Sequence, residues 1–408
     1  MTADKVFIIG CGYVGLPLAI QAAKSGYYVT GFDTNLHKIS SLQAGKSESP
    51  EVSSLELIQL QESGQLQFVS TLENQTESAI FVIAVPTPLD SKRKPDLSML
   101  DDACARISSV IFKGSLVINE STSYIGTLQN FIKPKIIAQS GIEEIDFAVA
   151  PERIDPANTR WKLKNTPRIV GGVNEKSLNR SFEFYIKFCD IVLKAPKVEI
   201  AEAAKLFENT YRQVNIALAN ELTGIANAFN ISSNEIIEFA STKPYGFMPF
   251  YPGVGVGGHC IPIDPSYLSF SADCVGVETK LINLANEINL INPHKVAQLI
   301  YKFFNGDIKG KKIQFAGISY KPNVSDLRES PVLELIDQLL NLGGIISWCD
   351  PLVSEWNGQR SIALHTEIDL GIITTPHDLI DFEVWRNSRI QVIDLSASSK
   401  NYGWAKFL

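Results

Sequence analysis

The segment GVGVGGHCIPIDP (253–265) places one cysteine, Cys260, at the end of a glycine-rich loop. Its glycines at 253, 255, 257 and 258 permit backbone conformations and close approaches that other residues do not accept. We therefore expect this loop to lie against a ligand. An isolated cysteine is usually inert and buried, but one delivered by such a loop is a better candidate for a nucleophile. Asp264, four residues later, could serve as its polar neighbour.

His259 precedes Cys260 and suggests a catalytic Cys–His pair. Because adjacent residues of an extended chain point to opposite sides, a structural or hydrogen-bonding role is favoured over a role as the base. The five histidines show no metal-ligand spacing, so no metal site is expected.

A long helical pattern begins at Glu199 and carries polar residues that could reach a substrate. Apolar residues keep helical spacing for about thirty residues without a proline. Lys205 and Asn209 are four positions apart, so both project from one face of the helix. A lysine in such a place is often only solvated, and its spacing alone leaves that alternative open. A helix of this length indicates a spine between two domains and a dimer contact.

The first residues predict a dinucleotide site. KVFIIG (5–10) is an apolar strand, GCGYVG supplies Gly10, Gly12 and Gly15 at GxGxxG spacing, and a helix pattern follows. This order of strand, glycine turn and helix is the context that the motif requires. A second strand ends at Asp33, the carboxylate expected on the ribose hydroxyls, so NAD is favoured over NADP.

Further strands are predicted at both ends of the chain. Those at 79–88 and 115–122 place Thr87 and residues 120–122 near the nicotinamide half of the cofactor, because ligands bind at the carboxyl ends of parallel strands. Strand-like segments at 311–320, 345–351, 369–376 and 390–395 predict a second unit of the same kind. The predicted fold is α/β, with two Rossmann-like doubly wound domains joined by a long central helix, and with boundaries at 1–195, 196–300 and 301–408.

Composition excludes several classes of protein. Of the 408 residues, 45% are hydrophobic and 20% are charged, which is ordinary for a globular chain. The net charge of −7 argues against a nucleic-acid partner, and no apolar run reaches the roughly 18 residues of a membrane span. The six cysteines are far apart, which fits reduced thiols in the cytoplasm. All except Cys260 are expected to be small buried side chains.

Seven motifs occur in one order along the chain: GCGYVG, VPTPLD, NEST, APERIDP, KLFENTYRQVNIALANEL, GVGVGGHCIPIDP and GISYKPNVSDLRESP. In these motifs the sequence resembles the UDP-glucose/GDP-mannose dehydrogenase family, NAD-dependent enzymes that oxidise a nucleotide sugar twice at C6. The segment 242–268 is most similar to the UDP-N-acetylglucosamine 6-dehydrogenase branch, and Ile263 stands where the UDP-glucose branch usually carries lysine. UDP-N-acetylmannosamine and UDP-N-acetylgalactosamine remain alternative substrates.

The resemblance implies a role for each matching residue. Cys260 would attack the aldehyde and form a thiohemiacetal and then a thioester, while Lys205, Asn209 and Asp264 would surround the reacting oxygen. Glu152 would activate the hydrolytic water, which Thr122 would help to position. The expected cofactor contacts are Gly10, Gly12, Tyr13, Val14, Gly15, Asp33, Thr87, Glu120 and Arg328, and the expected substrate contacts are Arg153, Lys205, Asn209, Tyr251, Gly257 and Lys321. The C-terminal domain would bind UDP, with the substrate between the domains.

Three positions depart from the family pattern. Ile125 precedes Gly126 where proline is usual, Val254 stands for another proline, and VIDLSASS lacks an arginine after its aspartate. The last departure alters the expected pyrophosphate contact or moves it to another cation. The favoured function is a cytoplasmic UDP-N-acetylglucosamine 6-dehydrogenase for surface polysaccharide, acting as a homodimer or larger homo-oligomer. A binding regulator without turnover is the alternative from another class, and a dehydrogenase that stops after one oxidation would not require the cysteine.

Overall fold

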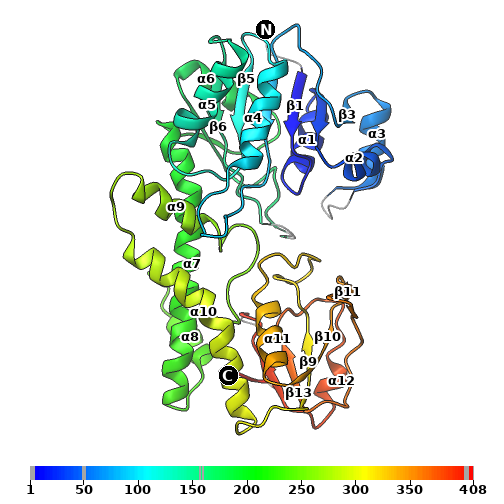
Figure 1. Ribbon diagram of the computed structural model, residues 1–408, viewed down its shortest axis with the longest axis vertical. Coiled ribbons are helices and arrows are strands. Elements are labelled where there is room, and N and C mark those ends of the chain that lie inside the picture. The colour runs from blue at the N-terminus through cyan, green and yellow to red at the C-terminus, as the bar shows by residue number, and fades with distance from the viewer. Residues whose placement is uncertain (1–4, 48–51, 156–157, 159, 399–403, 408) are drawn as a thin grey trace. The chain divides into compact units, whose positions relative to one another are not determined.

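Apolar strands alternate with helices in the N-terminal and in the C-terminal part of the chain (Figure 1). The computed structural model describes residues 5–47, 52–155, 158, 160–398 and 404–407. These divide into two units, Met1–Phe207 and Glu208–Leu408. The predicted three-domain boundaries stay a prediction. Pro156 of APERIDP and Ser399 of VIDLSASS lie outside the described residues.

The N-terminal unit contains an eight-stranded sheet of short apolar strands, as expected for a sheet covered on both faces. The strand order is β3-β2-β1-β4-β5-β6-β7-β8, and its first six strands follow the order typical of dinucleotide-binding sheets. Only the pairing of β6 with β7 is antiparallel among these neighbours. The strands are β1 (Lys5–Ile9), β2 (Tyr28–Phe32), β3 (Leu66–Val69), β4 (Ile80–Ile83), β5 (Leu116–Asn119), β6 (Asp146–Val149), β7 (Arg168–Gly172) and β8 (Val192–Lys194).

Helices cover both faces of this sheet, and each face has its own hydrophobic core. Side chains of α1, α3 and α6 pack on one face, and side chains of α4, η1, α5 and the start of α7 (Val198–Ala228) pack on the other. The unit is therefore doubly wound, as predicted. Its helices are α1 (Gly15–Lys24), α2 (Leu36–Gln43), α3 (Ser54–Glu62), α4 (Ser98–Val110), the π-helical η1 (Leu128–Ile132), α5 (Lys133–Ser140) and α6 (Glu175–Tyr185).

The C-terminal unit contains a five-stranded parallel sheet of order β10-β9-β13-β14-β15, and a separate two-stranded ribbon. Helices α10 and α11 pack on one face of the large sheet and α12 on the other. The strands are β9 (Lys312–Ala316), β10 (Ile345–Cys349), β11 (Glu355–Trp356), β12 (Gln359–Arg360), β13 (Leu370–Ile373), β14 (Val392–Asp394) and β15 (Lys406–Phe407). The helices are α8 (Ser233–Ser241), α9 (Asp264–Asp273), α10 (Lys280–Phe303), α11 (Pro331–Asn341) and α12 (Glu383–Arg386).

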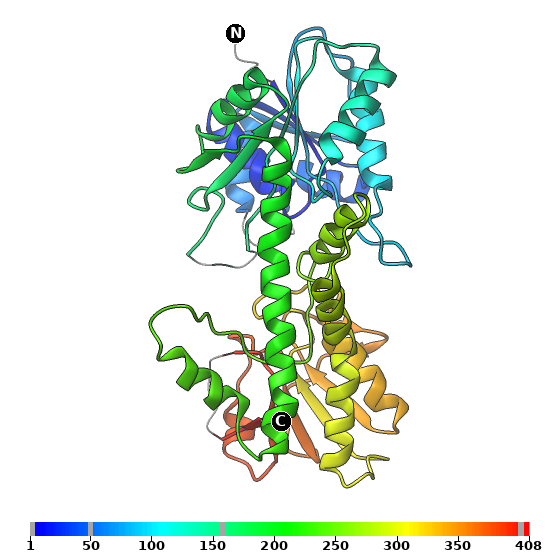
Figure 2. The ribbon, with the colours of Figure 1, turned by 90° about the vertical axis from the view of Figure 1, so that its left-hand side faces the viewer.

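The predicted long helix is α7 (Val198–Ala228), an unbroken helix of 31 residues that belongs to both units. Its C-terminal half runs beside α10 (Figure 2), where Gln213 donates to Asn286 (2.6 Å) and Asn220 donates to Asn289 (3.0 Å). Asn220 and Asn292, on α7 and α10, also hydrogen-bond the backbone at Gly253. The beginning of the glycine-rich loop is thus anchored by side-chain amides of two helices.

Among the described residues, no helix is both long enough and apolar enough to cross a membrane.

Candidate functional site

The glycine turn after β1 fits a bound dinucleotide. Gly10 has a φ of +100°, and a Cβ there would lie 2.5 Å from the carbonyl oxygen of Ala84. A Cβ on Gly15 would lie 1.8 Å from the carbonyl oxygen of Gly10, so the turn and α1 can meet only with glycine at both positions. A Cβ on Gly12 would meet no atom within 4 Å. The open side of the turn therefore lies at Gly12, where the motif brings a pyrophosphate to the backbone.

Asp33 follows β2 and lies beside this turn. Its Oδ2 accepts hydrogen bonds from the Cys11 amide (3.0 Å) and from Lys38 Nζ (2.9 Å), and its Oδ1 accepts from the Asn35 amide (2.9 Å). Burial raises the pKa of Asp33, but the hydrogen bonds from Asn35, Lys38 and Cys11 outweigh it and leave this pKa below its usual value. The carboxylate is thus fixed in its charged, hydrogen-bond-accepting form at the carboxyl end of the strand, where NAD binding requires it.

Other predicted cofactor residues surround the same strand ends. Thr87, after β4, is buried, Val14 is half-buried in the turn, and Tyr13 is exposed. Glu120, after β5, has a fully buried side chain that lies in an ion-pair cluster with Arg168. Its predicted contact with the cofactor stays a prediction.

Thr122 and Lys205 meet in the N-terminal unit. Lys205 lies on α7 and is buried, so it is not the solvated lysine of the alternative reading. Its Nζ donates to Thr122 Oγ1 at 2.7 Å. Lys205 is therefore a buried cation that contacts the segment after β5 through Thr122, where it can stabilise negative charge.

Glu202 holds the same segment from one turn earlier on α7. Its Oε2 accepts from the Gly126 amide (2.6 Å) and its Oε1 from the Leu128 amide (3.0 Å). Burial, only partly offset by these hydrogen bonds, raises the pKa of Glu202 to about 7. Gly126 has a φ of +90°. The departure at Ile125 thus lies in a turn that is held by a buried carboxylate.

Glu152, after β6, is buried and held by three donors. Its Oε1 accepts from the amides of Arg153 (2.6 Å) and Ile154 (2.7 Å), and its Oε2 accepts from Arg168 Nη2 (2.6 Å). Arg153, a predicted substrate contact, donates through Nη1 to the carbonyl of Pro167 at 3.1 Å. The carboxylate predicted to activate water therefore has a fixed orientation.

In the C-terminal unit, Cys260 is exposed and lies four residues before Asp264, the first residue of α9. Its carbonyl accepts from the Asp264 amide at 2.8 Å, so the two predicted neighbours meet through the backbone. The fully buried carboxylate of Asp264 accepts instead from Asn209 Nδ2 at 2.7 Å. Asn209 and Asp264 thus form a buried pair between α7 and α9. The prediction that the other cysteines are buried is wrong for Cys274, which caps the exposed end of α9, and Cys349 is only half-buried.

The glycines of the cysteine loop leave space for other segments of the chain to pack against the loop. A Cβ on Gly257 would lie 2.8 Å from the Tyr320 side chain, one on Gly258 would lie 2.8 Å from the Tyr320 ring, and one on Gly253 would lie 2.7 Å from Ala397. Val254, the second departure from the family pattern, packs into the C-terminal core. At least three of these glycines are therefore required for packing against later segments, and the expectation that the loop lies against a ligand stays a prediction.

His259 turns toward Asp326. Its Nε2 lies 2.9 Å from Asp326 Oδ2, and Arg328 Nη2 donates to the same oxygen at 2.7 Å. Burial raises the pKa of Asp326, but hydrogen bonds from His259 and Arg328 hold it well below its usual value. Residues 258–263 form bends and turns, so the extended-chain argument about His259 was wrong, although its hydrogen bond agrees with the favoured structural role.

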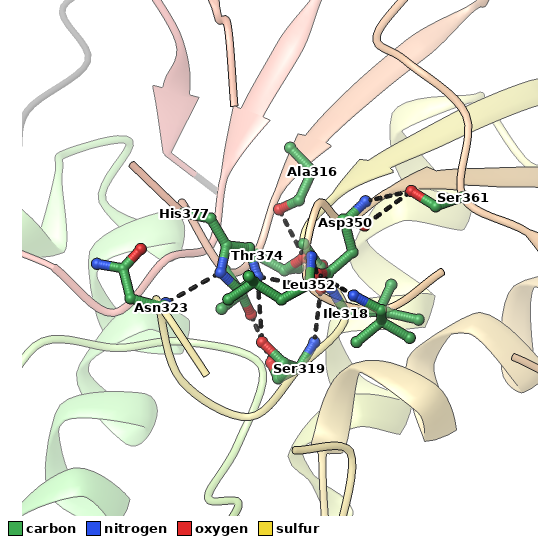
Figure 3. Close-up of polar contacts among 12 residues, drawn as sticks. Ala316, Ile318, Ser319, Asn323, Asp350, Leu352, Ser361, Thr374 and His377 are labelled. Atoms are coloured by element: carbon green, nitrogen blue, oxygen red, sulfur yellow. Dashed lines mark hydrogen bonds and ion pairs between the residues drawn. The ribbon is translucent and has the colours of Figure 1, made fainter. Parts of the chain in front are cut away.

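A buried polar cluster lies at the carboxyl ends of β9, β10 and β13 (Figure 3), next to the predicted cation Lys321 in sequence after β9. His377 Nε2 lies 3.0 Å from Asp350 Oδ2, and His377 Nδ1 accepts from the Asn323 amide at 2.9 Å. Ser319 Oγ donates to the Lys321 carbonyl at 3.0 Å. The cluster thus fixes the segment that carries Lys321. Lys321 and Tyr251 are both half-buried.

Arg168, Glu202 and His377 were not predicted from the sequence. Arg168 opens the apolar strand RIVGG, and a charge in such a run is a usable signal of a buried ion pair. Glu202 lies three residues before Lys205 on the same helix, and this spacing could have been noticed.

Comparison with known proteins identifies the family of the chain. Models of the UDP-glucose/GDP-mannose dehydrogenase family match the chain at 4–189 (NAD binding domain), 199–290 (central domain) and 315–391 (UDP binding domain). A UDP-N-acetyl-D-glucosamine 6-dehydrogenase of Pseudomonas aeruginosa is 34% identical over 86% of this chain and 83% of its own length. A UDP-N-acetyl-D-mannosamine dehydrogenase of Pyrococcus horikoshii is 36% identical over 86% of this chain and 84% of its own length.

A solved structure of a UDP-D-ManNAc dehydrogenase from Pyrococcus horikoshii has a TM-score of 0.86 and 31% identity, and the match covers 97% of this chain and 96% of that one. The three family models together span most of the chain and include the glycine turn, Lys205 and Cys260. The chain belongs to the UDP-glucose/GDP-mannose dehydrogenase family and is an NAD-dependent dehydrogenase.

Proposed function

We propose that the protein oxidises UDP-N-acetylglucosamine twice at C6, to UDP-N-acetylglucosaminuronic acid, through a covalent intermediate on Cys260. The observation that carries this proposal is the exposed Cys260, which lies in the turn before α9 and whose carbonyl accepts a hydrogen bond from the Asp264 amide. An alcohol dehydrogenase that performs one oxidation needs no nucleophile, whereas oxidation of an aldehyde to an acid is made easier by a thiolate adduct.

In the first oxidation, the residues of the chain must bind the C6 hydroxyl and take its proton. Bound NAD supplies the hydride acceptor for both oxidations. The Asn209–Asp264 pair supports a role at this hydroxyl, because an amide and a carboxylate held 2.7 Å apart can orient an alcohol and lead its proton away. Lys205 carries a positive charge that favours the developing alkoxide.

In the second oxidation, the Cys260 thiolate attacks the aldehyde carbon and forms a thiohemiacetal, which is then oxidised to a thioester. Lys205 stabilises the oxyanion. Water then attacks the thioester carbonyl, with Glu152 as the base and Thr122 as the residue that orients the water. The fixed carboxylate of Glu152 supports this role, since a base must be oriented toward the proton that it takes.

UDP-N-acetylmannosamine is the second candidate substrate, because the relatives are divided between enzymes named for the two sugars. The resemblance of segment 242–268 favours the glucosamine epimer. A panel of UDP-N-acetylglucosamine, UDP-N-acetylmannosamine, UDP-N-acetylgalactosamine and UDP-glucose distinguishes them by initial rates of NADH formation. We expect the highest kcat/KM with UDP-N-acetylglucosamine. Faster oxidation of another sugar would refute the choice of epimer, and binding of NAD without any turnover would favour a regulator.

The protein is also proposed to form a homodimer through α7. An apolar stripe of Ile200, Phe207, Leu218, Ile225 and Phe229 is exposed along this helix, at intervals of one, two or three turns. The buried polar residues Glu202 and Asn209 lie on the opposite side of the helix. An exposed apolar stripe of this length is typical of an interface between proteins, and a second copy of α7 would cover it by two-fold symmetry. The product would serve polysaccharide biosynthesis in the cytoplasm.

A further inference from the structure

A buried charge cluster in the N-terminal unit joins Glu152 to a second carboxylate. Arg168, the first residue of β7, donates through Nη2 to Glu152 Oε2 (2.6 Å), and its Nη1 lies 3.2 Å from Glu120 Oε1. The side chains of Arg168, Glu120 and Glu152 are 4%, 0% and 7% exposed. Two carboxylates therefore share one guanidinium away from solvent.

The other titratable groups that face Glu120 come from α6 and the turn after it. The hydroxyl of Tyr185 donates to Glu120 Oε1, and the Arg168 guanidinium lies 5.0 Å from the centre of the Tyr185 ring. Cys189, which follows α6, is also buried and interacts electrostatically with Glu120. Among the described residues, none donates a hydrogen bond to Glu120 Oε2. Glu120 is thus less completely hydrogen-bonded than Glu152, which has three donors.

The charge balance of the cluster depends on Glu120. With both carboxylates ionised and Arg168 positive, the buried cluster of three has one excess negative charge, which is costly away from water. A proton on Glu120 removes that excess. Burial, opposed by the positive charge of Arg168 and reinforced by the negative charge of Glu152, raises the pKa of Glu120 to about 7. Glu120 is therefore neutral below this pH and ionised above it.

We propose that Glu120 is a positioning residue for Glu152, because the charge of Glu120 determines how strongly Arg168 interacts with each of the two carboxylates. This inference rests on the proposed role of Glu152 in thioester hydrolysis. In that step the water oxygen bonds to the thioester carbonyl carbon and its proton passes to Glu152. The C–S bond breaks, and its electron pair stays on the Cys260 sulfur.

The charge of Glu120 changes how easily that proton is taken. When Glu120 is neutral, Glu152 is the only charged carboxylate beside Arg168. The positive charge of the guanidinium then favours the ionised form of Glu152. When Glu120 is ionised, it competes for Arg168, and its negative charge favours a proton on the neighbouring carboxylate. Hydrolysis should therefore speed up as the pH rises through the titration of Glu120.

The test is the rate of thioester hydrolysis in single-turnover experiments from about pH 5.5 to about pH 8.5, for wild type, Glu120→Gln and Tyr185→Phe. Wild type should show an inflection near the pKa of Glu120. Glu120→Gln should lose that inflection and remain about tenfold slower at high pH, the effect of about one pKa unit of interaction. Tyr185→Phe should keep the inflection but move it to higher pH, because the phenol hydrogen bond that lowers the pKa of Glu120 is gone.

An unchanged inflection in Glu120→Gln would overturn the inference, even if wild type releases two NADH per sugar and the proposed function stands. A readout without turnover is the infrared carboxyl band of the ligand-free protein. Because the pKa of Glu202 is also about 7, the comparison is made in a Glu202→Gln background. A band that titrates near pH 7 in this background and is missing after the further exchange Glu120→Gln supports the inference, and its persistence would overturn it. Failure of wild type to form any thioester, with the band still titrating, would count against the proposed function instead.

Discussion

Cys260 combines access with a restrained backbone. Its side chain is exposed, while its carbonyl is tied to the first turn of α9 by the Asp264 amide. The neighbouring histidine is tied to Asp326 rather than to the sulfur. A role for His259 as the base that activates Cys260 is therefore not favoured.

Replacing Cys260 by serine should block completion of the reaction. A serine hydroxyl is a much weaker nucleophile at neutral pH, so uronate formation should fall by at least about 10³-fold, while slow or partial first oxidation remains. Mass spectrometry of the sugar products measures this directly. Cys274→Ser, at the other exposed cysteine of the same unit, is the matched control and should behave as wild type. A full yield of uronate from Cys260→Ser would refute the thioester mechanism.

The site residues differ in how far the sequence could predict them. The glycine turn and Asp33 could be predicted because they depend on neighbours within one strand–turn–helix unit. The pairing of Arg168 with Glu120 and Glu152 could not, because it joins positions from three separate strands. The same holds for Tyr320, whose ring occupies the space beside Gly258 from a distant part of the chain.

At the scale of elements, residues on one face of α7 position the segment after β5. Lys205 contacts Thr122, and Glu202, one turn earlier, holds the amides of Gly126 and Leu128. Two residues of α7, one helical turn apart, thus hold the segment in place. Helix period and length were predicted from the pattern of apolar residues, but the pattern gave no sign that polar side chains would form the buried face.

Glu202→Gln should loosen this segment. A glutamine can accept only one of the two amide hydrogen bonds and presents an NH₂ group to the other, which should cost about 1–3 kcal/mol for an unsatisfied buried donor. Urea denaturation measures the loss of stability, and the half-buried Glu199→Gln on the same helix is the control.

The same variant should change the pH dependence of stability. The pKa of Glu202 is about 7 in the folded state and near 4.5 when unfolded, so the folded state binds more protons between these values. Its contribution to stability is present below about pH 4.5 and is lost as the pH rises to about 7. Wild type should show a larger decline than Glu202→Gln, in which the similarly raised pKa of Glu120 still contributes. Parallel curves for the two proteins would contradict the buried location of Glu202.

At the scale of the whole molecule, each unit is a doubly wound sheet with a ligand-binding edge, and α7 belongs to both. Strand order and helix placement agree with the predicted fold because short apolar strands alternating with helices allow few other arrangements. The amide contacts between α7 and α10 could not be predicted, since Asn220 and Asn289 are far apart in sequence.

Leu218→Glu should disrupt the proposed dimer. Leu218 is 65% exposed at the middle of the stripe, and a two-fold interface would bring two such glutamates together away from water. Light scattering after size-exclusion chromatography should show wild type as a dimer and Leu218→Glu as a monomer. Arg212→Glu, exposed on the same helix outside the stripe, should remain dimeric. Wild type that runs as a monomer would refute the role of the stripe.

The number of NADH molecules formed per sugar tests the central claim most directly. Limiting UDP-N-acetylglucosamine is incubated with excess NAD until absorbance stops rising, and the uronic acid is measured in the same sample. We predict two NADH for each sugar consumed, with one uronate formed. One NADH per sugar with an aldehyde product would contradict the four-electron oxidation through Cys260.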